Sequence, residues 1–181
     1  MMNQRSIALG LLLSATPLFA QKELTNQDIW FSPAFGVERV GGLNSMKDGL
    51  RYTAQEEDAG APVINIYDYK SGNKTGTLVN GKDLGGLPLE GYSLSGDEQR
   101  VMLETAVEPL YRYSYYAHQF VYDLKTRSLK ALSDTTKSKQ RLATFSPDGS
   151  HAAFVRDNNL HIVELATMKE TAITRDGEWN H

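Results

Sequence analysis

The chain has 181 residues, of which 40% are hydrophobic and 23% charged, a composition typical of a globular protein rather than of a disordered segment, a collagen or a coiled coil. It has no cysteine, so a disulfide scaffold, a cysteine nucleophile and a thiolate metal site are excluded. The formal net charge is −3 and Lys and Arg form no block, which argues against nucleic acid or an anionic membrane surface as a partner.

The first recognisable element is a predicted signal peptide over residues 1–20. Arg5 is its only charge, an apolar core runs over residues 7–19, and Ala20 precedes a polar run. This pattern predicts cleavage after Ala20 and an exported mature protein that begins at Gln21, in the periplasm, at the cell surface or secreted. An uncleaved anchor is the alternative, although the apolar run is shorter than the roughly 20 residues that span a bilayer.

Residues 21–41 form a lead-in segment without a long periodic pattern. Within it, only residues 28–31 and 36–39 have the character of a helical or irregular stretch. From residue 42 onward, short β-branched and aromatic runs alternate with clusters of Gly, Asp, Asn and Ser, which predicts β-strands. The clearest runs are residues 63–67, 119–122, 151–155 and 160–163.

These strand patterns repeat three times. The turn acids Asp48, Asp97 and Asp148 lie 49 and 51 residues apart. In each copy another acid closes the third strand: Asp68, Asp123 and Glu164. A period of roughly 40–50 residues with four short strands is typical of a β-propeller blade.

The predicted fold class is therefore all-β, an open arc of about three four-stranded blades over residues 42–181. Propellers close with about 4–8 blades, so we expect these three to be part of a larger propeller. A β-sandwich with the same strand spacing is the alternative.

Three segments resemble the N-terminal propeller of dipeptidyl peptidase IV-like serine peptidases, of the prolyl oligopeptidase clan. They are Gly42-Leu43-Asn44-Ser45-Met46-Lys47-Asp48-Gly49 with Tyr52-Thr53, then Tyr111-Arg112-Tyr113-Ser114-Tyr115 with Tyr122-Asp123-Leu124, and the Ser146-Pro147-Asp148-Gly149 turn. The resemblance covers roughly residues 25–181. Tyr113 departs from the His that is common in animal members.

The resemblance implies an exported serine exopeptidase that releases X-Pro or X-Ala dipeptides from peptide amino termini. Its Ser-His-Asp triad would lie in a C-terminal α/β-hydrolase domain that this sequence does not include, so no catalytic residue, metal ligand or cofactor site is expected here. The implied partners are peptide substrates, the chain's own hydrolase domain and a second copy of the full-length enzyme. The rival class is a non-catalytic exported propeller that binds a protein or glycan, since a fold alone does not define a function.

Arg112 is the candidate substrate-binding residue. In the family, the matching arginine hydrogen-bonds a substrate backbone carbonyl, which suits the five donors of a guanidinium. If residues 111–116 are extended, Arg112, Ser114 and Tyr116 share one face of a strand. The alternative is a surface arginine packed over tyrosines by cation–π contact.

Two further motifs imitate catalytic or phosphate-binding loops. The segment around Ser93 resembles the Gly-x-Ser-x-Gly motif of a nucleophile elbow. Ser95 stands where the motif requires Gly, so catalysis by Ser93 is not expected. The spacing of Gly76, Gly81 and Lys82 imitates a phosphate loop, but Asp83 replaces the magnesium-binding Ser/Thr, and a loop between blades is expected instead.

The remaining polar groups give no site. No pair of histidines has metal-ligand spacing on one predicted face with a carboxylate nearby; the four are His118, His151, His161 and His181. The acid run of residues 56–58 is expected to be a solvated loop, with a cation site as the alternative.

Overall fold

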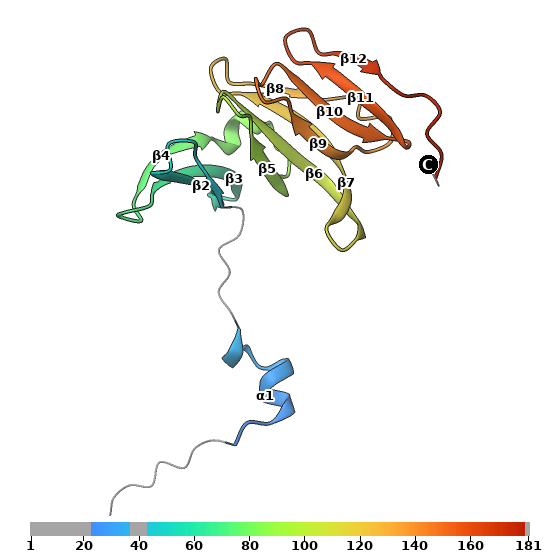
Figure 1. Ribbon diagram of the computed structural model, residues 1–181. Coiled ribbons are helices and arrows are strands. Elements are labelled where there is room, and N and C mark those ends of the chain that lie inside the picture. The colour runs from blue at the N-terminus through green and yellow to red at the C-terminus, as the bar shows by residue number, and fades with distance from the viewer. Residues whose placement is uncertain (1–22, 37–42, 180–181) are drawn as a thin grey trace, which may run out of the picture. The chain divides into compact units, whose positions relative to one another are not determined.

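The computed structural model describes residues 23–36 and 43–179, so the predicted signal peptide over residues 1–20 lies outside the described part of the chain (Figure 1). The chain divides into two units, Met1–Arg39 and Val40–His181. No helix in the described ranges is long and apolar enough to cross a membrane.

The first unit contains the short helix α1 (Asn26–Phe31) and the 3-10 turn η1 (Pro33–Phe35). Thr25 caps α1: its Oγ1 accepts a hydrogen bond from the Asp28 N–H at 3.2 Å, and the Asp28 carboxylate accepts from the Thr25 N–H at 3.2 Å. This capping box explains where the helix starts. The helical stretch expected at residues 28–31 is confirmed, whereas residues 37–39 lie outside the described part.

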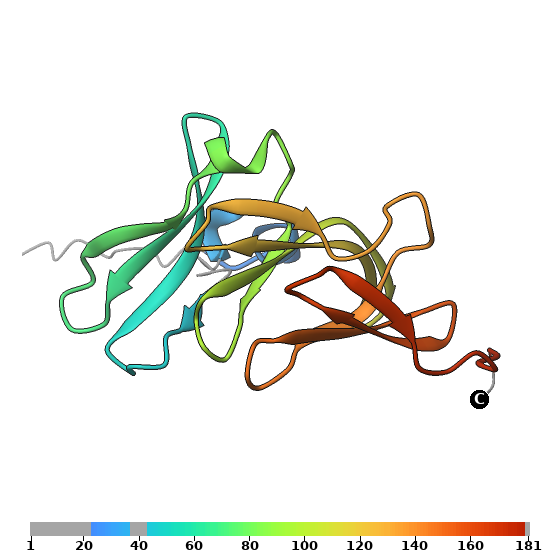
Figure 2. The ribbon, with the colours of Figure 1, turned by 90° about the horizontal axis from the view of Figure 1, so that it is seen from above.

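The second unit is built from three four-stranded antiparallel sheets, in each of which consecutive strands are neighbours. The first blade consists of β1 (Asn44–Ser45), β2 (Arg51–Asp58), β3 (Ala61–Asp68) and β4 (Lys74–Val79). The second consists of β5 (Gly91–Leu94), β6 (Arg100–Tyr111), β7 (Ser114–Asp123) and β8 (Ser128–Ala131). The third consists of β9 (Arg141–Phe145), β10 (His151–Arg156), β11 (Asn159–Glu164) and β12 (Lys169–Ala172). Figure 2 shows the blades following one another in chain order, and the predicted three four-stranded units are confirmed.

The repeated turn acids have the same structural role in each blade. Asp48, Asp97 and Asp148 each lie between the first two strands of a blade, where Oδ1 accepts the backbone N–H two residues later at 2.8, 3.1 and 3.0 Å. An aspartate that bonds its own backbone in this way stabilises a turn. These turns also join blades, because Arg100 Nη1 donates to the carbonyl oxygen of Gly149 at 2.9 Å.

The acids expected to close the third strand of each blade do so. Asp68, Asp123 and Glu164 are the last residues of β3, β7 and β11. Asp68 and Asp123 then accept backbone N–H groups of the following turn at 2.7 and 2.8 Å, from Ser71 and Thr126. The acids that recur in the sequence therefore occupy equivalent positions in the three blades.

The core lies in two seams between neighbouring blades. The seam between the first and second blades is filled by Ile64, Val79, Leu84, Leu89, Tyr92, Val101, Leu103 and Tyr122. The seam between the second and third blades is filled by Met102, Val121, Leu132, Ala152, Phe154, Val163 and Leu165.

Strand β6 contributes to both seams. Val101 and Leu103 face the first seam, and Met102, between them, faces the second. Successive side chains of a strand point to opposite faces, so a sheet covered on both sides has a continuous apolar run rather than an alternating one. The second blade is thus held between its two neighbours.

Candidate functional site

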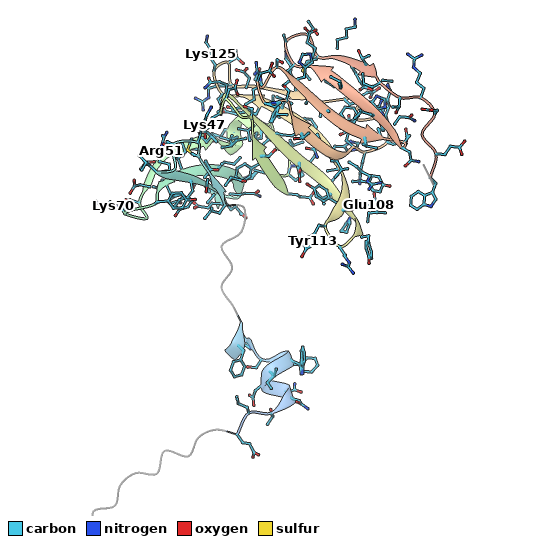
Figure 3. All side chains as sticks on the ribbon, in the orientation of Figure 1. Lys47, Arg51, Lys70, Glu108, Tyr113 and Lys125 are labelled. Carbon is cyan, nitrogen blue, oxygen red and sulfur yellow. The ribbon has the colours of Figure 1, made fainter. Side chains whose placement is uncertain are left out.

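The candidate site is the hairpin arm, which we define as residues 106–116 at the joined ends of β6 and β7. These are the two longest strands of the described residues, with 12 and 10 residues. The arm projects beyond the rest of its sheet, with Tyr113 at its end and Glu108 further back along it (Figures 1 and 3). Tyr113 is 96% exposed, so its ring packs against almost nothing in the described structure.

A β-bulge marks where the arm leaves the sheet. The register between β6 and β7 shifts between Thr105 and Glu108, and Ala106 within the bulge has a φ of +52°. The bulge turns the Val107 N–H toward Glu90, whose Oε1 accepts it at 3.2 Å. Bulges bend a strand and re-aim the residues beyond them, so this one sets the direction of the arm.

The expectation that residues 111–116 form one extended strand is wrong. Tyr111 pairs with Ser114, which leaves Arg112 and Tyr113 as a two-residue turn, and Arg112 has a φ of +49°. Tight hairpins need such positive φ values to match the twist of their strands. Arg112 is therefore at the tip of the arm and does not share a strand face with Ser114 and Tyr116.

The guanidinium of Arg112 packs against its neighbour. Its Nε donates to Tyr111 Oη at 3.1 Å, and its central carbon lies 5.3 Å from the centre of the Tyr111 ring. This is the cation–π contact considered as the alternative to substrate binding. The two Nη groups of Arg112 have no hydrogen-bond partner among the described residues. The contact with Tyr111 is therefore compatible with substrate binding, because Tyr111 orients the guanidinium and leaves the Nη donors available.

The base of the arm is held by a tyrosine–carboxylate pair. Tyr115 Oη donates to Glu104 Oε1 at 2.7 Å. Burial, and then the hydrogen bond to Glu104 and its negative charge, raise the pKa of Tyr115 to about 12, so the hydroxyl remains a neutral donor at physiological pH. The sequence gives no sign of this pair, because the two residues meet only in the strand register that the bulge determines.

The other sequence-derived candidates are structural. Ser93 lies in β5, which continues through a turn into β6. A nucleophile elbow would lead from a strand into a helix, so Ser93 is not part of one, as expected. Gly81 and Lys82 belong to the 3-10 turn η2 (Gly81–Leu84) between the first two blades. The acids of residues 56–58 are exposed, as expected, but they end β2 rather than form a loop, and Glu56 accepts a hydrogen bond from Asn65 Nδ2 at 2.8 Å.

The histidines are distributed over the second and third blades. His118, His151 and His161 lie in β7, β10 and β11, while His181 is outside the described residues. In the described ranges, no group of three or more His, Asp or Glu residues is arranged to hold a metal ion.

Comparison with known proteins relates the chain to one family. Residues 95–181 match the family described as the dipeptidyl peptidase IV (DPP IV) N-terminal region. The sequence is 28% identical to a probable dipeptidyl-aminopeptidase B of Tuber melanosporum over 82% of this chain and 17% of that protein. It is 34% identical to the probable dipeptidyl-aminopeptidase B of Sordaria macrospora over 85% of this chain and 17% of that one.

A solved structure supports the same relationship. The fold is similar to the crystal structure of Porphyromonas gingivalis dipeptidyl peptidase 4, with a TM-score of 0.75 and 34% identity over 87% of this chain and 22% of that one. The chain thus spans about a fifth of the length of the relatives that it matches. The predicted β-propeller blades are confirmed, and the chain is a relative of the N-terminal propeller region of dipeptidyl peptidase IV.

Proposed function

We propose that this chain is the propeller part of an exported serine exopeptidase that releases X-Pro or X-Ala dipeptides from peptide amino termini. The observation that carries the proposal is the 34% identity to a dipeptidyl peptidase 4 over 87% of the chain, with the same fold. The two fungal relatives are probable dipeptidyl-aminopeptidases, which supports an exopeptidase.

In this proposal, the hairpin arm is the substrate-binding element of the propeller. Arg112 at its tip offers the outer edge of a rigid guanidinium fork, while Tyr111 holds the inner edge through Nε. Such a fork suits a peptide carbonyl oxygen, and a charged donor makes a stronger hydrogen bond than a neutral one. The exposed position of the tip leaves room for a peptide beside it.

The chemistry itself would be acyl transfer through a Ser-His-Asp triad of an α/β-hydrolase domain in the same protein. The propeller would restrict access to that triad and hold the amino-terminal end of the substrate. Its partners would be peptide substrates, the hydrolase domain and, in a homodimer, a second copy of the enzyme. The signal-peptide pattern of residues 1–20 supports the proposed export.

The experiment compares two chromogenic amides on the purified full-length protein. Gly-Pro-p-nitroanilide should be hydrolysed, whereas the N-acetylated form, which lacks the free amino terminus, should not. An active-site serine label should abolish the activity. Absence of hydrolysis would refute the peptidase and leave the non-catalytic propeller, and equal hydrolysis of the blocked amide would refute the exopeptidase assignment.

A further inference from the structure

A second feature of the molecule lies beside the arm, at the seam between the second and third blades. It is a cavity of about 480 Å³, which we call the seam pocket. Strand β7, the segment before β9 and the β10–β11 turn border this open pocket, whose lining includes His118, Lys137, Ser138, Lys139, Arg141 and Asp157. Tyr116 and Glu108, from the arm, complete one wall.

The pocket carries a surplus of positive charge in a chain whose net charge is −3. Three cationic side chains line it, Lys137, Lys139 and Arg141, against the two carboxylates of Glu108 and Asp157. Lys139 Nζ is already paired with Glu108 Oε2 at 3.2 Å. Among the lining residues, the surplus is therefore a single positive charge, which one monoanion would balance.

Arg141 is the cation best placed to bind an anion. Its guanidinium lies over the Tyr116 ring, 5.5 Å from the ring centre, and it has no carboxylate partner among the described residues. Stacking on an aromatic ring orients the planar fork without using its hydrogen-bond donors. The fork of Arg141 is therefore held in place and unneutralised.

Two buried polar atoms of the pocket have no hydrogen-bond partner in the described structure. They are Nε of Arg141 and Nδ1 of His118. Buried polar groups in proteins are nearly always hydrogen-bonded, and an unpaired one costs free energy. An arginine Nε can only donate, so what is lacking at Arg141 is an acceptor.

We propose that the seam pocket binds a carboxylate group. A planar carboxylate accepts two parallel hydrogen bonds from a guanidinium, and its single negative charge matches the surplus of the pocket. A phosphate monoester also fits a guanidinium, but near pH 7 it carries about −1.5 to −2 charges, more than the single surplus charge of the lining. The structure thus favours a carboxylate over a phosphate.

The natural source of this carboxylate is an acidic peptide, and this part of the inference rests on the proposed function. Tyr116 of the pocket and Arg112 of the tip are four residues apart in one hairpin, a path of at most about 13 Å. A peptide whose backbone is held at Arg112 could therefore place a carboxylate a few residues away in the seam pocket. Acidic peptides would then be preferred substrates.

The test measures binding of N-acetylglycine to the full-length protein by isothermal titration calorimetry. This probe has a carboxylate but no free amino terminus. N-acetylglycinamide, which lacks the charge, should not bind, and inorganic phosphate should bind more weakly. Lys137→Gln and Arg141→Gln should each weaken binding of N-acetylglycine by about tenfold or more, because each removes a charged donor. Arg141→Lys should restore it only in part, since the ammonium group lacks the fork.

The matched control is Lys125→Gln, a surface lysine that Figure 3 places at the other end of the second blade from Glu108, and it should leave binding unchanged. Melting temperatures identify variants that do not fold; Lys137 is exposed, so its variant gives the answer if Arg141→Gln is unstable.

Several results would overturn the proposal: no binding, equal binding of the amide, tighter binding of phosphate, or binding unaffected by both pocket variants. Turnover of Gly-Pro-p-nitroanilide on the same samples separates the two hypotheses. Binding without turnover overturns the proposed function alone, and turnover without binding overturns the seam pocket alone.

Discussion

Replacing Leu103 by Ala should open the seam between the first and second blades. Leu103 is fully buried in β6, between Tyr92 of β5 and Phe120 of β7. A buried Leu→Ala change costs about 2–5 kcal/mol, because the transfer free energy of the removed atoms is lost and a cavity remains. We take about 3 kcal/mol, since backbone pairs on both sides of Leu103 limit how far the cavity can collapse.

The assay is hydrogen–deuterium exchange of the full-length protein, read by mass spectrometry on peptides from β3 and β6. A loss of about 3 kcal/mol corresponds to exchange roughly 100-fold faster where opening of the seam controls it. Leu110→Ala is the matched control, because this residue lies in the same strand but is 40% exposed on the arm. It should change exchange in these peptides less than tenfold. Equal effects of the two substitutions would refute the assignment of the core to the seams.

Three further predictions concern ionisation and processing. Glu104→Gln should lower the pKa of Tyr115 from about 12, without returning it to 10.0, because burial, the larger cause, remains; ultraviolet difference titration measures this, and an unchanged pKa would contradict it. The hydrogen bonds from Ser146 and Ser150 hold the pKa of Asp148 at about 2, below its ordinary 3.8, so Asp148 stabilises the fold above about pH 4 and ceases to do so as the pH falls toward 2. The difference in melting temperature between wild type and Asp148→Asn should therefore shrink as the pH falls from about 4 to about 2, and a difference as large at pH 2 as at pH 5 would contradict this. Amino-terminal sequencing of the exported protein should begin at Gln21, and retention of residue 1 would rule out cleavage.

The three blades could be predicted from the sequence alone. Asp48, Asp97 and Asp148 each accept a hydrogen bond from the backbone of their own turn. Such a turn depends on neighbouring residues only, so it can be recognised in the sequence. The buried strands were equally readable, since β-branched and aromatic runs between turn residues have few other structural solutions.

The arm was not predictable in the same way. The alternation of residues 111–116 suits an extended strand, and the turn at Arg112 and Tyr113 has no Gly or Asn to announce it. Pro109 was the available signal, since proline within a strand marks an edge or an irregularity. The seam pocket could not be predicted from the sequence, because Arg141 and Tyr116 come together only when neighbouring blades pack against each other.

The central claim is that the arm presents Arg112 to a peptide, and the turnover of an X-Pro amide by Arg112→Ala in the full-length enzyme tests it most directly. Loss of a charged donor to a carbonyl should remove roughly 1.5–3 kcal/mol, which lowers kcat/KM about tenfold to a hundredfold. Arg112→Lys should recover part of this, and the melting temperature should stay near that of wild type. Arg51→Ala, a surface arginine that Figure 3 places in the first blade, away from the arm, should leave kcat/KM unchanged. Near-wild-type turnover by Arg112→Ala would contradict the account and leave Arg112 as a structural residue packed on Tyr111.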